Sequence, residues 1–159
     1  MSLDDEADAL RKIPMFANLS PAKLKLLAFT SDALTFMDGE AVVHVGDRSE
    51  HAFVIIDGEV EVLTYGDHGV ASFVVGKNQL VGEMGVLNDA PRSATIRAKG
   101  EVRVLRLSAE TLLNLLSENP EAALHVMRLL ADRLSSTLQK YEEAQRRLDA
   151  YERSGKPAG

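Results

Sequence analysis

One stretch of the chain, residues 81–98, reads VGEMGVLNDAPRSATIRA and carries the chemistry of an anion site. Gly82 has no Cβ, so its backbone can approach a ligand closely. Glu83 has a carboxylate that only accepts hydrogen bonds, which suits a sugar hydroxyl as its partner. Arg92, nine residues later, supplies a planar charged group that matches phosphate oxygens. These residue types predict a site for a small phosphorylated sugar.

The residues around this pair support the same chemistry. Residues 83–87 predict about one helical turn, whose free N–H groups favour an anion. Pro91 restricts the backbone just before the arginine, and Ser93 adds a hydroxyl beside it. The same residue types also allow a surface ion pair between Glu83 and Arg92, worth about 0–1 kcal/mol, with the glycines marking turns. Residue types alone leave both interpretations open.

The whole stretch closely resembles the phosphate-binding cassette of cyclic nucleotide-binding domains. In that family a Gly-Glu pair precedes a short helix, and a Pro-Arg motif followed by small residues then leads into a strand. This chain has GE at 82–83, PRSAT at 91–95 and an alternating segment at 96–98. Other family signatures follow in order upstream: DGE at 38–40, GD at 46–47 and FVIIDGEVEVL at 53–63. The resemblance extends from about Asp8 to about Tyr141.

This resemblance implies a ligand and a set of residues that bind it. The ligand is a cyclic nucleotide, with cyclic AMP favoured because Ser93 stands where members selective for cyclic GMP often have Thr; cyclic GMP stays open. The implied ligand-binding residues are Gly82, Glu83, Met84, Arg92, Ser93, Ala94 and Thr137. Thr137 enters by resemblance to dimeric bacterial members, in which the corresponding helix covers the base. The alternative for Thr137 is a surface threonine on a helix flank.

The middle of the chain, residues 34–107, consists of short apolar runs separated by Gly, Asp and Asn. Such runs predict a sandwich or barrel of short strands. The Asp57-Gly58 pair between two runs predicts a hairpin turn. The expected strands are residues 41–45, 52–56, 59–63, 71–75, 94–98 and 102–107. With the resemblance, the expected fold is α+β: an antiparallel β-roll of jelly-roll type, a double-stranded β-helix, flanked by N-terminal helices and a long C-terminal dimerisation helix.

The flanking segments carry helical signals. Residues 8–13 and 20–32 are expected to be helical, the second with Ser20 as N-cap and Pro21 at the first position. Residues 108–116 form another expected helix, for which both Ser108 and Thr111 are candidate caps. The expected parts of the chain are a helical segment at 1–33, the β-roll at 34–107 with its cassette at 81–95, C-terminal helices at 108–152 and a flexible tail at 153–159.

The last expected helix, residues 120–151, has an apolar seam. Its members recur at alternating spacings of three and four: Leu124, Met127, Ala131, Leu134, Leu138, Tyr141, Gln145 and Leu148. An apolar repeat of about 3.5 residues predicts packing against a partner helix, as in a parallel coiled coil. The alternative is that the first half of the seam packs on the chain's own barrel. The seam predicts a homodimer through this helix.

Composition limits the other function classes. At 159 residues the chain is the size of one domain, and its net charge of -6 gives no general attraction to nucleic acid or anionic membranes. The absence of cysteine excludes disulfides, thiolate metal sites and cysteine nucleophiles. An acidic start and the lack of about 18 consecutive apolar residues predict a soluble, cytoplasmic protein without a membrane segment.

No catalytic motif is visible in the sequence. The four histidines form no metal-binding pattern, and phosphate-loop, dinucleotide and nucleophile-elbow motifs are missing. The sequence therefore predicts a sensor without enzymatic activity, metal or cofactor, acting on an unidentified downstream protein or fused effector. Specific DNA binding is not expected, because no helix-turn-helix follows the last helix. Two alternatives stay open: a dimeric interaction module that has lost nucleotide binding, and a small hydrolase with an unrecognised site.

Overall fold

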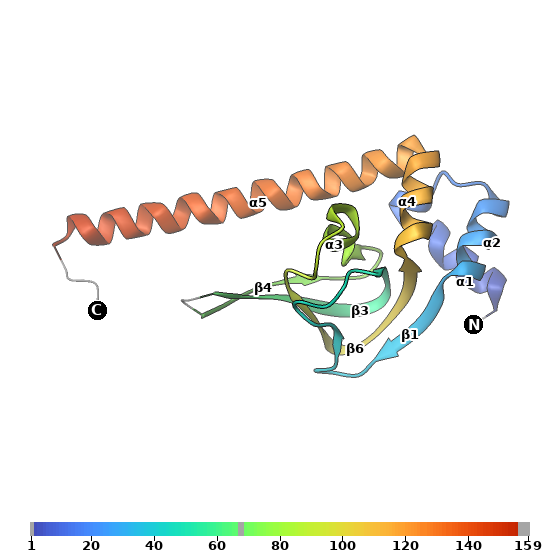
Figure 1. Cartoon of the computed structure of the whole chain (residues 1–159), viewed down its shortest axis with the longest axis horizontal. Helices are drawn as coiled ribbons and strands as arrows, with labels where there is room; N and C mark the ends of the chain where they lie inside the picture. The colour runs from blue at the N-terminus through green and yellow to red at the C-terminus, as the bar shows by residue number, and fades with distance from the viewer. Residues whose placement is uncertain (1, 67–68, 156–159) are drawn as a thin grey trace. The chain divides into compact units, whose positions relative to one another are not determined.

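The computed structural model describes residues 2–66 and 69–155 and divides into two compact units, Met1–Ala122 and Ala123–Gly159 (Figure 1). The helices of the first unit are α1 (Leu3–Arg11), the 3-10 helix η1 (Pro14–Phe16), α2 (Pro21–Thr30), α3 (Glu83–Asn88) and α4 (Ala109–Glu118). Its strands are β1 (Asp32–Phe36), β2 (Ala41–Val43), β3 (His51–Gly66), β4 (Gly69–Val75), β5 (Leu80–Val81) and β6 (Thr95–Ser108). Helix α5 (Pro120–Arg153) begins at the end of the first unit, and its residues from Ala123 onward lie in the second unit.

The described strands form one antiparallel six-stranded sheet with the order β1-β6-β3-β4. The short strand β2 pairs with β6, and β5 pairs with β3. Helices α1, α2 and α4 gather at one end of this sheet, and α3 lies on β3 (Figure 1). The expected α+β class, with an antiparallel sheet, N-terminal helices and a long C-terminal helix, is confirmed.

The two longest strands, β3 and β6, bend together, and this corrects the expected hairpin at Asp57-Gly58. Strand β3 continues through this pair without a break, and both of its halves pair with β6. The pairing shifts here, because Asp57 faces Arg103 while Glu59 faces Lys99. Gly58 has φ +90°, and a Cβ on it would lie 2.4 Å from the carbonyl oxygen of Glu101. The Asp-Gly pair therefore forms a bulge in a continuous strand.

The actual hairpin joins β3 to β4, since Gly66 faces Gly69 across the pair. The residues that connect them, 67–68, lie outside the described part of the chain. The expected strands at 94–98 and 102–107 likewise belong to the single strand β6. The sequence pattern underestimates the length of these strands, because a glycine inside a strand resembles a turn signal. Only the pairing with a neighbouring strand shows that the strand continues through it.

The outer face of the β3–β6 pair carries opposite charges in register. Acidic side chains on β3 face basic side chains on β6, in the pairs Asp57–Arg103, Glu59–Lys99 and Glu61–Arg97. The inner face is apolar and includes Phe53, Ile55, Val60, Val62, Ile96, Ala98, Val102 and Val104. If β3 shifted by one residue relative to β6, its charged side chains would point into the apolar core. The alternation of charged and apolar residues therefore specifies how β3 and β6 pair.

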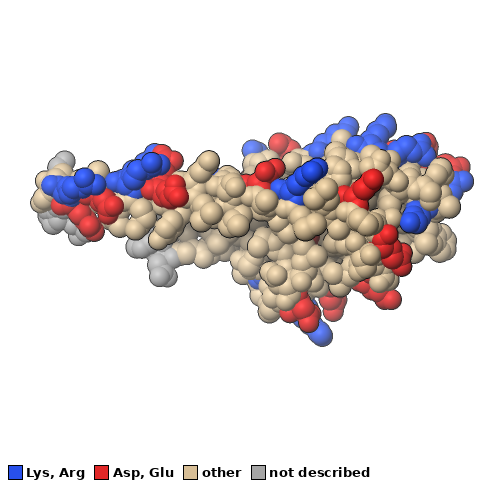
Figure 2. Space-filling model, turned by 90° about the horizontal axis from the view of Figure 1, so that it is seen from above, with Lys and Arg blue, Asp and Glu red and all other residues tan. Residues whose placement is uncertain are grey.

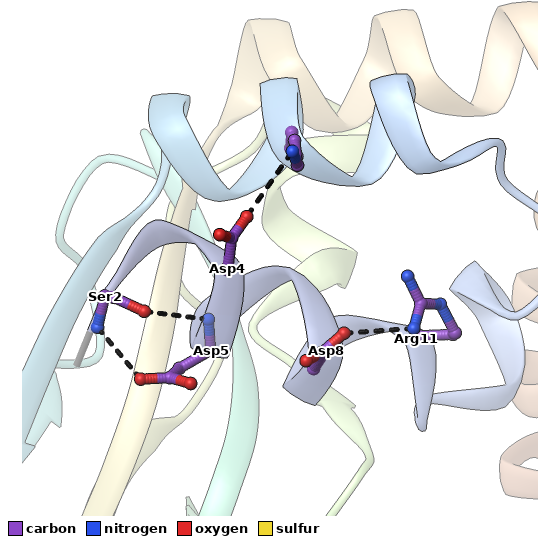
Figure 3. A network of polar contacts seen from close by, with 6 residues as sticks. Ser2, Asp4, Asp5, Asp8 and Arg11 are labelled. Carbon is purple, nitrogen blue, oxygen red and sulfur yellow. Dashed lines mark hydrogen bonds and ion pairs between the residues drawn. The ribbon is translucent and has the colours of Figure 1, made fainter.

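Helix α1 begins earlier than expected, at Leu3 instead of Asp8. Its start is stabilised by a capping box: the Asp5 backbone N–H donates to Ser2 Oγ at 3.2 Å, and the Ser2 N–H donates to the Asp5 carboxylate at 3.3 Å (Figure 3). An ion pair of 3.4 Å between Lys25 and Asp4 connects α2 to α1. The sequence interpretation overlooked this cap, which satisfies N–H groups of the first turn.

The other caps agree with expectation. Ser20 accepts the Lys23 N–H at 3.3 Å at the start of α2, and Ser108 accepts the Thr111 N–H at 3.1 Å at the start of α4. Helix α2 ends at Thr30, two residues before the expected end, because Asp32 already belongs to β1. A local serine cap is thus a dependable signal for where a helix begins.

Helix α5 continues to Arg153 and keeps its seam residues exposed. Leu134, Leu138 and Tyr141 are 60%, 50% and 63% exposed. Charged side chains of both signs alternate over its C-terminal half, at the left of Figure 2, and include an Arg147–Glu143 ion pair of 2.6 Å. Of the expected tail, residues 156–159 lie outside the described residues. Within residues 2–66 and 69–155, no helix has the length and apolarity needed to cross a membrane.

Candidate ligand-binding site

The candidate site is centred on the turn that leads from β5 into α3. Gly82 caps α3 in the left-handed region, with φ +79° and ψ +11°. A Cβ on Gly82 would lie 3.1 Å from Arg92 Nη1 and 3.3 Å from Cδ2 of Phe53. Both the backbone angle and the lack of space therefore require glycine at this position. The expected helical turn after it is confirmed as α3.

Arg92 reaches back across this turn and is 6% exposed. Its Nη1 donates to the carbonyl oxygen of Gly82 at 2.6 Å, and its Nη2 donates to the carbonyl oxygen of His51. Its buried Nε has no hydrogen-bond partner among the described residues. A buried N–H without a partner costs free energy, so Arg92 keeps an unused donor inside the site.

The surroundings of the guanidinium are partly apolar and partly acidic. The centre of the Phe53 ring lies 6.0 Å from Arg92 Cζ. Burial lowers the pKa of Arg92, and the nearby Asp47 and Glu83 carboxylates oppose this shift. The positive charge is therefore incompletely solvated, and a further anion at the unused donor would stabilise it.

Glu83, at the start of α3, is 1% exposed. Because Glu83 and Arg92 are both buried, the alternative of a surface ion pair between them is wrong. Ser93 is exposed and Ala94 is half-buried, beside the arginine. Met84, next to Glu83, is 52% exposed. Six of the seven expected residues thus lie in one segment, residues 82–94, which contains α3. Two of them are buried ionisable residues, Glu83 and Arg92, and the others are more exposed.

The seventh residue, Thr137, lies in the second unit, on α5. Its hydroxyl donates to the carbonyl oxygen of Arg133 at 2.8 Å, as threonines in helices commonly do. Its role as a contact to the base stays a prediction.

The loop between β2 and β3 holds the backbone of Arg92 on both sides. The Gly46 N–H donates to the carbonyl oxygen of Arg92 at 2.8 Å, and the Arg92 N–H donates to the carbonyl oxygen of Asp47 at 2.8 Å. The sequence marked Gly46-Asp47 only as a family signature, without a contact to Arg92, and it did not indicate a role for His51 or Phe53 at the site. No local spacing connects these residues to Arg92, so only the fold reveals them.

Comparison with known proteins places these features in a family. The model of the family described as "Cyclic nucleotide-binding domain" matches residues 33–119. A cAMP-dependent protein kinase regulatory subunit of Blastocladiella emersonii is 29% identical over 136 residues, which cover 84% of this chain and 31% of that protein. The chain thus spans less than a third of the kinase regulatory subunits that it matches.

Solved structures show the same fold. The catabolite activator protein of Thermus thermophilus has a TM-score of 0.71 and 25% identity, over 83% of this chain and 63% of that chain. The regulatory subunit of a cAMP-independent protein kinase A from Trypanosoma brucei has a TM-score of 0.63 and 22% identity, over 80% of this chain and 53% of that chain. With a family model that covers more than half of its residues and includes the whole turn from Gly82 to Arg92, the chain belongs to the cyclic nucleotide-binding domain family.

Proposed function

We propose that this domain is a sensor that binds a cyclic nucleotide, cyclic AMP in preference to cyclic GMP, at the cassette of residues 81–95. One observation carries the proposal. Arg92 is buried, its Nε has no partner among the described residues, and it lies within the segment that matches the family. An anion that accepts from this donor removes the cost of burying it.

Each residue of the cassette has a role in this proposal. Arg92 binds the phosphate with its remaining N–H groups. Gly82, at the turn where the ligand binds, leaves the room in which the guanidinium lies. Glu83 accepts a hydrogen bond from the ribose hydroxyl. The rim residues Met84, Ser93 and Ala94 line the approach to the phosphate and ribose.

The base must contribute as well. Micromolar affinity requires about 8 kcal/mol, whereas hydrogen bonds to charged groups contribute about 1.5–3 kcal/mol each. Phosphate and ribose contacts alone do not reach this total once the cost of association is included. By resemblance to dimeric family members, we assign a contact with the base to Thr137.

The proposed output is a change in packing and not a reaction. A ligand shifts an equilibrium between two arrangements only by its differential affinity for them. The exposed seam of α5 supports dimerisation as a parallel coiled coil. The packing of this helix is the property that nucleotide binding would change. The recipient is a partner protein or a fused effector.

Calorimetric titration with cyclic AMP and cyclic GMP tests the site. The wild type should bind both, cyclic AMP more tightly, and Arg92→Ala should weaken binding by about tenfold or more. Arg97→Ala is the matched control, because Arg97 is an exposed arginine paired with Glu61 at 3.9 Å. Equal affinity of the wild type and Arg92→Ala would refute the assignment of the site.

A second candidate function is a dimeric interaction module of the same fold that does not bind nucleotide. Two hydrogen bonds favour it, because Nη1 and Nη2 of Arg92 already donate to the carbonyl oxygens of Gly82 and His51 and are thus used within the protein itself. The T. brucei relative, described as part of a cAMP-independent kinase, has this fold. A thermal-shift measurement separates the two candidates, because only a sensor is stabilised by either nucleotide.

A further inference from the structure

A side-chain hydrogen bond outside the expected site fastens the end of the cassette helix. Ser49, in the loop between β2 and β3, donates from Oγ to the carbonyl oxygen of Ala90 at 2.6 Å. The Ala90 N–H in turn donates to the carbonyl oxygen of Gly85 in α3 at 3.0 Å. The bond joins residues 41 positions apart, two residues before Arg92.

Gly85 makes room for this contact. A Cβ on Gly85 would lie 1.9 Å from Ser49 Oγ, 2.7 Å from Ser49 Cβ and 3.1 Å from the carbonyl oxygen of Ala90. The φ of Gly85 lies outside the left-handed region, so its backbone conformation does not require glycine. The need for glycine arises from the close approach of Ser49.

The segment between α3 and Arg92 has one further backbone bond, in which the Asp89 N–H donates to the carbonyl oxygen of Val86 at 3.4 Å. Ser49, Ala90 and Pro91 border an open cavity of about 460 Å³, so part of this segment faces open space. Pro91 has no N–H to donate. The next anchor along the chain is the Arg92 N–H, which donates to the carbonyl oxygen of Asp47 at 2.8 Å.

We propose that Ser49 is a positioning residue of the binding site, which acts through Ala90 to keep Arg92 in its binding conformation before nucleotide arrives. This inference rests on the proposed function and deepens it. Without the Ser49 hydroxyl, residues 89–91 sample other conformations. The apparent affinity then falls in proportion to the population that remains competent to bind.

The test compares Ser49→Ala with the wild type in two measurements. The first is amide hydrogen exchange of Ala90 and Arg92 in the nucleotide-free protein, and the second is cyclic AMP binding by calorimetry and stopped flow. Ser31→Ala is the matched control, since Ser31 Oγ also donates to a backbone carbonyl oxygen, that of Ala28 at 3.0 Å, at the end of α2.

Ser49→Ala should speed exchange at both amides and weaken affinity by about two- to tenfold. The loss should lie in the association rate, with the dissociation rate unchanged, because the bound conformation is the same. Ser31→Ala should change none of these quantities. A role of Ser49 in general stability would instead lower the melting temperature and leave the rates of the folded protein as they were.

The role of Ser49 would be overturned if Ser49→Ala left the exchange of the Ala90 and Arg92 amides unchanged. It would also be overturned if the exchange changed but the affinity for cyclic AMP did not. Failure of the proposed function looks different, because the wild type would then bind neither cyclic AMP nor cyclic GMP. The exchange measurement needs no nucleotide, so it still decides whether Ser49 holds Ala90 in that case.

Discussion

The Nη1 atom of Arg92 donates to the carbonyl oxygen of Gly82 at 2.6 Å, across ten residues of chain. Two of the residues that the sequence predicts as ligand contacts are therefore also partners of each other. In the proposed complex, the ligand phosphate would share this guanidinium with a backbone carbonyl. The conformation of the cassette thus involves Arg92 directly, in addition to the ligand contact proposed for it.

This dependence predicts that Arg92→Ala destabilises the protein without any nucleotide. The substitution leaves the partly buried carbonyl oxygens of Gly82 and His51 without this donor. A fully buried unsatisfied group costs about 1–3 kcal/mol, which sets the upper end of the expected loss per group. Thermal unfolding of the nucleotide-free proteins measures the effect, with exposed Arg97→Ala as control. An unchanged melting temperature for Arg92→Ala would show that the two carbonyl contacts contribute nothing.

The role of Glu83 predicts a loss that depends on the sugar. Glu83→Gln keeps the shape of the buried side chain but weakens its acceptor, so affinity for cyclic AMP should fall by about tenfold or more. The affinity for 2'-deoxy cyclic AMP, which lacks the hydroxyl donor, should change much less. Calorimetry with both ligands measures the difference. Equal losses for the two sugars would contradict a contact between Glu83 and the ribose.

Gly82 and Gly100 provide a matched pair of substitutions. Both have positive φ, +79° and +74°, so an alanine costs about 1–2 kcal/mol of backbone strain at either position. Only Gly82 is also crowded, by Arg92 and Phe53, whereas a Cβ on Gly100 meets no described atom within 4 Å. Gly82→Ala should therefore unfold at lower denaturant than Gly100→Ala. Equal denaturant midpoints for the two variants would mean that Arg92 and Phe53 move away from a Cβ at position 82 without a cost in stability.

The seam of α5 predicts concentration-dependent self-association. Leu138 lies on the seam and is 50% exposed, so Leu138→Asp places a charge in the proposed coiled-coil interface and should produce a monomer. Ser136→Asp is the control, because at about 3.6 residues per turn Ser136 lies on the opposite side of the helix. Sedimentation equilibrium distinguishes the variants. A wild-type monomer at high concentration would argue against the dimer.

His51 predicts part of the response to acid. Burial lowers the pKa of His51 below its ordinary value of 6.5, as does Arg106, while Glu50 and Asp32 act in the opposite direction. The unfolded chain therefore binds this proton more readily, and stability is lost as the pH falls below about 6.5. His51→Gln should lose less free energy of unfolding than the wild type between about pH 7.5 and about pH 5.5. Denaturant titrations at both pH values check this, and equal losses would contradict it.

Helix starts were predictable where a serine side chain defines them locally. Ser20 and Ser108 satisfy N–H groups three residues away, so a short window of sequence contains the whole interaction. The Asp57-Gly58 pair was misinterpreted for the opposite reason. Asp-Gly fits both a hairpin turn and a bulge, and the choice depends on β6, about 40 residues away, which pairs with both sides of Gly58.

The sequence by itself determined the residue types of the cassette and the spacing of the α5 seam, because these are properties of side chains and of short-range periodicity. Only the tertiary structure decided that Glu83 and Arg92 are buried, and that Arg92 donates to the carbonyl oxygens of Gly82 and His51. The same holds for the bond from Ser49 to Ala90. Every residue except proline offers the same backbone donor and acceptor, so contacts with carbonyl oxygens leave no mark in the sequence and appear only when the chain has folded.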